Sequence, residues 1–351
     1  MKKELHAIHL KFRGPVHFGS KKSDYGQSET QLHSDTLYSA IFQTWAMIGK
    51  EEWIPTKEKP EFGFAISSTF PFFYDGKEHQ HFFPKPYGQL FKKDKNKEAI
   101  FVEHRKKIKK IAYLHRDAFY EWCEKGEIDI DTSLLKGQFY AKSLPKDEEG
   151  NPIKLVDTDV VPRVKVSREE GEDATPFAMD RMYFYDKEGQ HGGLYFLFHG
   201  EEKDLKKVKV ALTLLEDEGL GTDRKVGQGQ FSFEIVPFKK PHWSGKASIN
   251  LSLLLPESQQ WVDEHVLNHD LGGYGLIERG GWITTPGLDT YRKKTVHFFE
   301  AGSIFKYESQ SIQQAGTLKD VYPSESLNGI TEQPHPVWRV GKSLLFPVKT
   351  D

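Results

Sequence analysis

Two amphipathic helical patterns, each lying between strand patterns, constrain the fold of this chain most. Residues 5–12 alternate apolar and polar side chains, as a β-strand does. Apolar side chains then recur at helical spacing between Leu37 and Ile48 and again between Leu205 and Leu215. Strand-like runs lie between the two helices, and another follows the second helix. This order of elements predicts an α+β fold.

One compact solution to this order is a four-stranded antiparallel sheet with two helices on one face, the ferredoxin-like arrangement. RNA-recognition modules often use this fold, although a fold alone does not give a function. In the strand-like run 62–73, Pro71 indicates a sheet edge or the end of a strand. The run 181–200 predicts a hairpin with its turn at residues 186–193.

The length of the chain predicts two domains, because 351 residues exceed what one compact core usually holds. We place the first domain at residues 1–240 and the second, a degenerate copy of the same fold, at residues 241–351. A basic linker, FKKPHW, joins them. Residues 88–160 are interpreted as an insertion in the first domain, with one helix near residues 100–125.

Composition excludes several classes of site. The chain has one cysteine, so neither an intrachain disulfide nor a cysteine-based zinc site is expected. The N-terminus lacks the apolar stretch of a signal peptide, and we find no apolar run long enough to span a membrane. These features predict a cytoplasmic protein. Its net charge of −2 means that any nucleic-acid site must be a local basic patch.

The most specific motif is GLGTDRKVGQGQF, from Gly219 to Phe231, which joins the end of the second helix to a strand. Its glycines allow a ligand to approach the backbone closely, and Arg224 and Lys225 add charge that binds phosphate. It is not a nucleotide P-loop, because that motif precedes a helix and ends in Gly-Lys-Ser/Thr. A glycine-rich helix cap is the simpler alternative, but it would need only one or two glycines.

A glycine-rich loop after the last helix of a ferredoxin-like domain resembles the RAMP superfamily of CRISPR proteins. More closely, the chain resembles the family of the fourth subunit of the Csm complex, the type III-A CRISPR effector. Four segments carry this resemblance: LHSDTLYSAI from Leu32, FPKP from Phe83, the glycine-rich loop, and the pair ERGGWI and PVWRVGK near the C-terminus. Residues 88–160 have no counterpart in this resemblance.

The resemblance implies a subunit that is not an enzyme and needs no cofactor. Members of this family cap one end of the antiviral complex and hold the repeat-derived 5′ tag of the guide RNA. They contact the large polymerase-like subunit and the first copy of the backbone RAMP subunit, and they meet target RNA only indirectly. In RAMP proteins a β-hairpin thumb wedges against the guide RNA, so the resemblance implies such a thumb in the first domain.

The candidate RNA-binding residues fall into three groups: the loop, the residues after the first strand, and the thumb that the resemblance implies. We expect Gly221 and Gly227 to lie where the backbone meets the RNA. In the thumb, Phe177, Met179 and Met182 are either an apolar wedge or core residues. The full set of candidates is Arg13, His17, Arg163, Lys165, Arg168, Met179, Gly219, Gly221, Arg224, Lys225, Gly227 and Gly229.

Other features leave alternatives open. The basic cluster from His104 to Arg116 is either a solvated helix face or a surface for RNA or an acidic partner. His33 beside Ser34 and Asp35 resembles part of a ribonuclease site, but Ser34 and Asp35 also suit a helix N-terminus. The alternative function is therefore a metal-independent CRISPR repeat endoribonuclease. The HQHF segment offers His79 and His81 as metal ligands, but i, i+2 spacing alone is weak evidence.

Overall fold

A computed structural model describes most of the chain, as an α+β fold. The described residues are 2–19, 28–93, 98–142, 144–146, 149–150, 154–166, 174–187, 189–267, 272–283, 291–323 and 335–349. Among them, no helix is both long enough and apolar enough to cross a membrane.

The largest sheet begins with four antiparallel strands in the order β12-β1-β11-β3. These are β12 (Phe231–Pro237), β1 (Glu4–Phe12), β11 (Gln190–Gly200) and β3 (Phe70–Tyr74). The strand predicted at residues 5–12 is confirmed. Further along the sheet come β4 (His79–Pro84), β5 (Tyr113–His115), β7 (Phe139–Tyr140) and β6 (Leu135–Lys136), while β2 (Ala65–Ile66) and β10 (Asp186–Lys187) pair beside β11.

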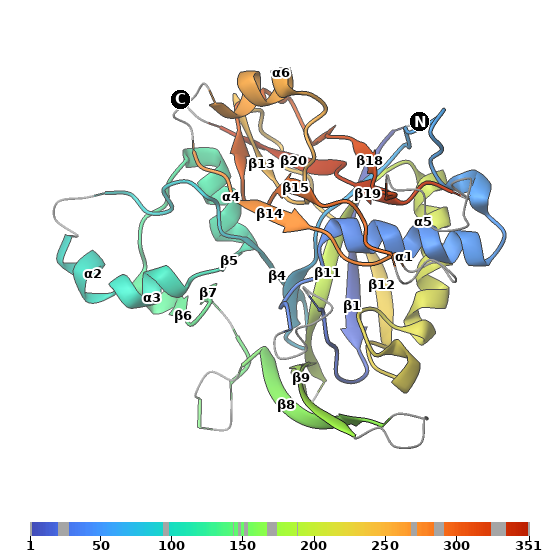
Figure 1. Ribbon diagram of the computed structural model, residues 1–351. Helices are drawn as coiled ribbons and strands as arrows, with labels where there is room; N and C mark the ends of the chain where they lie inside the picture. Colours follow the sequence, from blue (N-terminus) through green and yellow to red (C-terminus); the bar gives the residue numbers. More distant parts are fainter. Residues whose placement is uncertain are drawn as a thin grey trace.

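Two helices, α1 (Ser34–Met47) and α5 (Glu202–Glu218), cover one face of this sheet (Figure 1). Both helices were predicted, and their apolar faces are buried together. One hydrophobic core holds Ile8 and Leu10 of β1 with Trp45 of α1 and Leu212 of α5. Leu5 and Ala7 point to the other face and belong to a second core. The alternation of β1 thus supplies one core on each side of the sheet.

The run 62–73 forms two short strands, β2 and β3, rather than one. β3 lies between β11 and β4, so the first alternative for Pro71, a sheet edge, is wrong. The second alternative agrees with the structure, because the strand ends at Tyr74. The pairing explains how an interior strand tolerates Pro71. Pro71 stands opposite Leu194 of β11, whereas pairing with β4 begins only at Phe72. Its missing N–H is therefore not needed for the β4 ladder.

The prediction of one helix near residues 100–125 is also wrong. Three short helices occur there, α2 (Glu98–Glu103), α3 (Arg105–Lys110) and α4 (Arg116–Lys125), and β5 separates the last two. The residues of β5 are buried and pair with β4, opposite Phe82 to Pro84. Extension of the sheet by this apolar, aromatic run outweighs the local helical spacing.

The C-terminal part forms a separate four-stranded sheet in the order β16-β13-β20-β17. Its strands are β16 (Ile304–Phe305), β13 (Ala247–Asn250), β20 (Ser343–Val348) and β17 (Gln313–Ala315). Two strand pairs accompany it, β14 (Leu276–Arg279) with β15 (Val296–Phe299) and β18 (Leu318–Asp320) with β19 (Trp338–Val340). One short helix, α6 (Gln259–Val262), is continued by a π-helical turn at Asp263–Leu267.

A long hairpin of β8 (Val156–Lys165) and β9 (Thr175–Phe184) extends from the sheet, at the bottom of Figure 1. Two backbone hydrogen bonds between Val16 and Met182 join its base to the segment after β1. The hairpin predicted at 181–200 is confirmed in its turn, because Lys187 of β10 pairs with Gln190 of β11. Short 3-10 turns occur at Glu51–Trp53, Thr132–Leu134 and Arg224–Val226.

Candidate nucleic-acid interface

The glycine-rich loop closes on itself and on the segment after β1. Gly219, Gly221 and Gly229 have φ values of +84°, +98° and +79°. A Cβ at Gly229 would lie 2.0 Å from the carbonyl oxygen of Leu220, and one at Gly221 would lie 2.6 Å from that of His17. These glycines are therefore required by the loop's own packing. Their expected role in admitting a ligand does not follow from this geometry.

Gly227 differs from the other three glycines. Its φ is +79°, but a Cβ there would meet no atom within 4 Å. It follows the single turn of 3-10 helix that carries Arg224 and Lys225. Lys225 is exposed, whereas Arg224 is half-buried and lies 3.9 Å from the carboxylate of Glu218. Within the described part of the chain, the amides of Gly221, Asp223 and Arg224 donate to no backbone carbonyl. This side of the loop thus combines two cations with free N–H groups, as anion-binding loops do.

The segment after β1 accepts backbone hydrogen bonds from the glycine-rich loop. The amide of Thr222 donates to the carbonyl of His17 at 2.9 Å, and the amide of Gly229 donates to that of Pro15 at 3.0 Å. His17 itself is buried, and its Nδ1 donates to the carbonyl of Asp180 on β9 at 2.6 Å. Arg13 is half-exposed and forms an ion pair with Asp217, with Nη1 and Oδ1 3.2 Å apart.

The β8–β9 hairpin also reaches this loop. Nη1 of Arg163 lies 3.1 Å from Oδ2 of Asp223, the loop's one non-glycine residue with positive φ (59°). Lys165 ends β8, paired in register with Thr175, and Arg168 lies outside the described residues. The side chain of Met179 is fully buried, as is that of Met182. This burial agrees with the core alternative and leaves Met179 no free apolar tip to insert between bases.

The glycine-rich loop and the segment after β1 border a groove of about 640 Å³. The glycine-rich loop and the segment after β1 form one side, and the first turns of α1 form its floor. The C-terminal part supplies the opposite side through residues 278–283, Lys293 and Arg339. Burial, with Arg339 and Arg279 nearby, lowers the pKa of Lys293 to about 8, although Asp35 opposes the shift. A strand lying in this groove would contact both parts of the chain.

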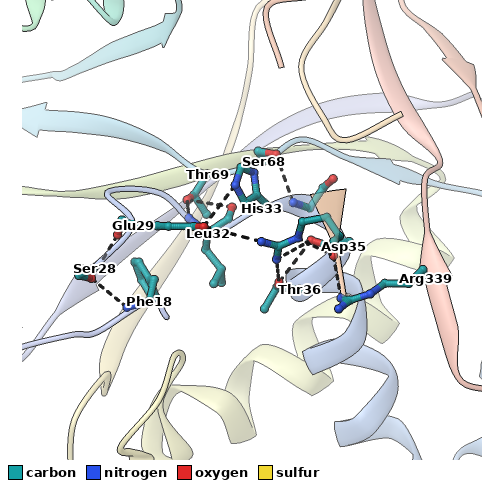
Figure 2. A network of polar contacts seen from close by, with 12 residues as sticks. Phe18, Ser28, Glu29, Leu32, His33, Asp35, Thr36, Ser68, Thr69 and Arg339 are labelled. Atoms are coloured by element: carbon teal, nitrogen blue, oxygen red, sulfur yellow. Dashed lines mark hydrogen bonds and ion pairs between the residues drawn. The ribbon is translucent and has the colours of Figure 1, made fainter. Parts of the chain in front are cut away.

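A buried ion cluster closes the groove at the start of α1 (Figure 2). Asp35 is fully buried, and its carboxylate accepts hydrogen bonds from Arg339 at 2.7 Å and from Arg279 at 3.2 Å. Burial alone would raise the pKa of Asp35, but these two guanidinium groups lower it to about 2. Asp35 thus joins α1 to β14 and β19.

Ser34 was expected at the N-terminus of α1 as its capping residue, but the structure places it inside the helix. His33 occupies the N-cap position, and Ser34 is the first helical residue. The hydroxyl of Ser34 accepts from the amide of Leu253 in the C-terminal part at 2.9 Å. His33 forms an ion pair with Glu29, with Nε2 and Oε2 3.3 Å apart, and both residues line the groove.

The groove contains three basic residues that we did not predict, Arg279, Lys293 and Arg339. Two of them lie within ERGGWI and PVWRVGK, the motifs that carry the family resemblance. An arginine inside each of two otherwise apolar strand patterns was the available signal, because a buried arginine needs an acidic partner. Lys293 had no such signal.

The most basic stretch of the chain lies elsewhere. Arg105, Lys106, Lys107, Lys109 and Lys110 are exposed on α3. In Figure 1, α3 lies on the left of the molecule, whereas the C-terminal end of α5, where the loop begins, lies on the right. This cluster and the groove are therefore separate surfaces.

Comparison with known proteins identifies the relatives of this chain. Residues 244–348 match the family model of the CRISPR Csm4 C-terminal domain. A protein of Methanocaldococcus jannaschii described as CRISPR system Cms protein Csm4 is 25% identical, over 96% of this chain and 95% of its own length.

Solved structures show the same fold. A chain in the Csm3–Csm4 subcomplex of a type III-A CRISPR-Cas interference complex aligns with a TM-score of 0.58 and 18% identity, over 99% of this chain and 100% of its own. A chain in a Csm1–Csm4 cassette with cA4 aligns with a TM-score of 0.56 and 18% identity, over 99% of both chains.

Proposed function

We propose that this chain, which matches the Csm4 C-terminal domain family over residues 244–348 and is similar to a Csm4 protein along its length, is a subunit of a type III-A CRISPR interference complex. In that complex it binds the repeat-derived 5′ tag of the guide RNA and has no catalytic role. It caps the complex beside the large polymerase-like subunit and contacts the first backbone RAMP subunit. Solved structures of relatives with Csm1 and with Csm3 support these two partners.

The observation that carries the RNA proposal is a groove lined by basic residues from two parts of the chain. Arg224 of the glycine-rich loop lines one side, and Arg279 and Arg339 line the other. Arg163 of the hairpin reaches the loop through its ion pair with Asp223. Phosphate contacts from arginine side chains and backbone amides position a nucleic acid without reading its sequence. A constant 5′ tag bound in one register needs this kind of contact.

We propose the ferredoxin-like arrangement for residues 1–240. The order β12-β1-β11-β3, with α1 and α5 on one face, supports it. Residues 241–351 would then form the second, degenerate domain, and their own four-stranded sheet supports this division. The groove lies between the two, so its shape depends on the Asp35 cluster.

A second candidate function rests on the His33–Glu29 pair. It lines the groove, and a metal-independent ribonuclease could use such a pair as acid and base. His17 is less suited to that role, because it is buried and its Nδ1 is already bonded. Incubation of the purified chain with repeat RNA and a chelator distinguishes the two functions. Cleavage that His33→Ala abolishes would support the ribonuclease.

The direct test of the proposed function is crosslinking. The complex is reconstituted with guide RNA that carries a photoreactive base at each position of the 5′ tag, and crosslinked peptides are identified by mass spectrometry. We expect tag crosslinks in residues 219–229 and 156–166. Crosslinks confined to the guide's other end, or to partner subunits alone, would contradict the proposal.

A further inference from the structure

A cluster of histidines lies on the face of the main sheet that points away from α1 and α5. His9 of β1 shares this face with Leu5 and Ala7, and it is buried. Glu234 of β12 stands directly opposite His9 in the antiparallel register. His79 and His81 reach the same place from β4. Three strands distant in sequence therefore bring imidazole and carboxylate groups together.

The contacts within this cluster are close. One ligand atom each from His9, His79 and Glu234 lie within 4.8 Å of one another. Nε2 of His79 is 3.8 Å from Oε2 of Glu234, and the rings of His9 and His79 stack at 3.9 Å between centroids. Nε2 of His9 lies 2.8 Å from Nε2 of His81.

The hydrogen bond between His9 and His81 uses the Nε2 atom of each ring and leaves both Nδ1 atoms without a partner among the described residues. A hydrogen bond between two Nε2 atoms requires that one ring donates and the other accepts. One ring donates through Nε2, so its Nδ1 is a bare lone pair, and the other then carries its proton on Nδ1. Within the described part of the chain, neither Nδ1 has a hydrogen-bond partner. Buried imidazole nitrogens without partners are costly, and a cation at one of them removes that cost.

We propose that His9, His79 and Glu234 bind a divalent transition-metal ion, with zinc as the best match. Two imidazoles and one carboxylate form an established zinc ligand set. Nδ1 of His9 would be a ligand while its Nε2–H donates to His81. A metal-bound histidine usually donates its other N–H in this way, most often to a carboxylate, a carbonyl or water. His79 must tilt out of its stack on His9 to direct its lone pair at the ion.

The ion would connect β1 and β12 to β4, the strand from which the sheet continues into β5. It would stabilise the folded chain in proportion to its affinity and concentration. This proposal concerns a face of the sheet other than the groove, so its outcome is independent of the RNA-binding proposal.

The test uses the full chain without an affinity tag, stripped with a chelator and titrated with Zn²⁺ by calorimetry. Thermal melting is followed in parallel, and Co²⁺ absorption reports the ligand geometry. Glu234→Gln changes an exposed carboxylate, so this variant without metal should melt like the metal-free wild type. His79→Ala also removes a mostly buried ring that stacks on His9, so the shift that Zn²⁺ causes is measured against this variant's own metal-free melting temperature. His242→Ala is the matched control, because Nε2 of His242 is also 3.8 Å from a carboxylate, that of Glu124.

We expect the wild type to bind one Zn²⁺ and to melt at a higher temperature with it. Each ligand variant should bind Zn²⁺ at least tenfold more weakly and lose the shift in melting temperature, while the control behaves as the wild type. The proposal is overturned if the wild type binds no more tightly than His79→Ala, or if His242→Ala weakens binding to the same extent.

Discussion

The guanidinium of Arg163 lies 3.1 Å from the carboxylate of Asp223, and this ion pair joins the β8–β9 hairpin to the glycine-rich loop. Each side chain is 28% exposed. In our proposal, RNA phosphates compete with Asp223 for Arg163. Asp223 therefore positions Arg163 before RNA binds and also weakens the interaction.

Opposite effects are expected when the two partners are changed. Arg163→Ala removes a phosphate contact, so the slope of log affinity against log salt should fall by about one unit. Asp223→Asn removes a negative charge from the loop and should leave RNA retention equal or higher. The measurement is guide-RNA binding by the reconstituted complex over a series of salt concentrations. Lys11→Ala is the control, because Lys11 forms an ion pair of the same 3.1 Å length with Asp186. Equal losses for Arg163→Ala and Asp223→Asn would mean that the pair only stabilises the fold.

The loop glycines should differ in their effect on stability. Gly229→Ala places a Cβ against the backbone of Leu220 at a left-handed φ, so we expect a loss of about 3 kcal/mol or more. Gly227→Ala enters open space and should cost only about 1–2 kcal/mol, for the left-handed backbone alone. Chemical denaturation of the isolated chain measures both. Similar losses for the two variants would contradict the packing described for the loop.

Local sequence patterns predicted the parts of the fold that local physics decides. Both long helices and the strand at 5–12 follow from apolar spacing alone. The split of the 100–125 region could not be predicted, because β5 exists only by pairing with β4. The interior position of β3 depends likewise on which residues of β4 pair with it, and Pro71 by itself does not reveal this.

Only part of the site could be predicted, because local sequence patterns do not show which distant residues meet. The glycine-rich loop was visible as a motif, and Arg163 as one of several cations on a strand. Their pairing through Asp223 depends on where the hairpin lies. Asp35 looked like an ordinary helix-start residue, whereas its partners Arg279 and Arg339 lie more than 240 positions away in the sequence.

Removal of the Asp35 charge should destabilise the chain strongly. Asp35→Asn leaves two buried guanidinium groups without their anion, and breaking a buried ion pair in this way costs about 3–5 kcal/mol. Asp217→Asn is the control, since Asp217 is exposed and pairs with Arg13 at the surface, and it should cost less than about 1 kcal/mol. Denaturant midpoints report both variants. A loss below 1 kcal/mol for Asp35→Asn would show that this cluster contributes little to stability.

The same cluster predicts a pH dependence. The pKa of Asp35 is about 2 in the folded chain, below its ordinary value of 3.8 in the unfolded chain. The stabilisation is therefore complete above about pH 4 and is lost as the pH falls towards 2. Denaturant midpoints measured between pH 5 and pH 2 should fall more steeply for the wild type than for Asp35→Asn. Parallel curves for the two proteins would show that Asp35 does not titrate as described.

The central claim, that the loop faces guide RNA, is tested most directly at Gly227. Gly221 is unsuitable, because any side chain there collides with the backbone of His17. Gly227→Asp and Gly227→Asn place side chains of the same shape in open space, both types tolerate a left-handed φ, and only the charge differs. The measurement is the guide RNA that co-purifies with the assembled complex. We predict near wild-type RNA for Gly227→Asn and a loss of about tenfold or more for Gly227→Asp, a difference of about 1.4 kcal/mol or more. Equal RNA in the two complexes would contradict the account.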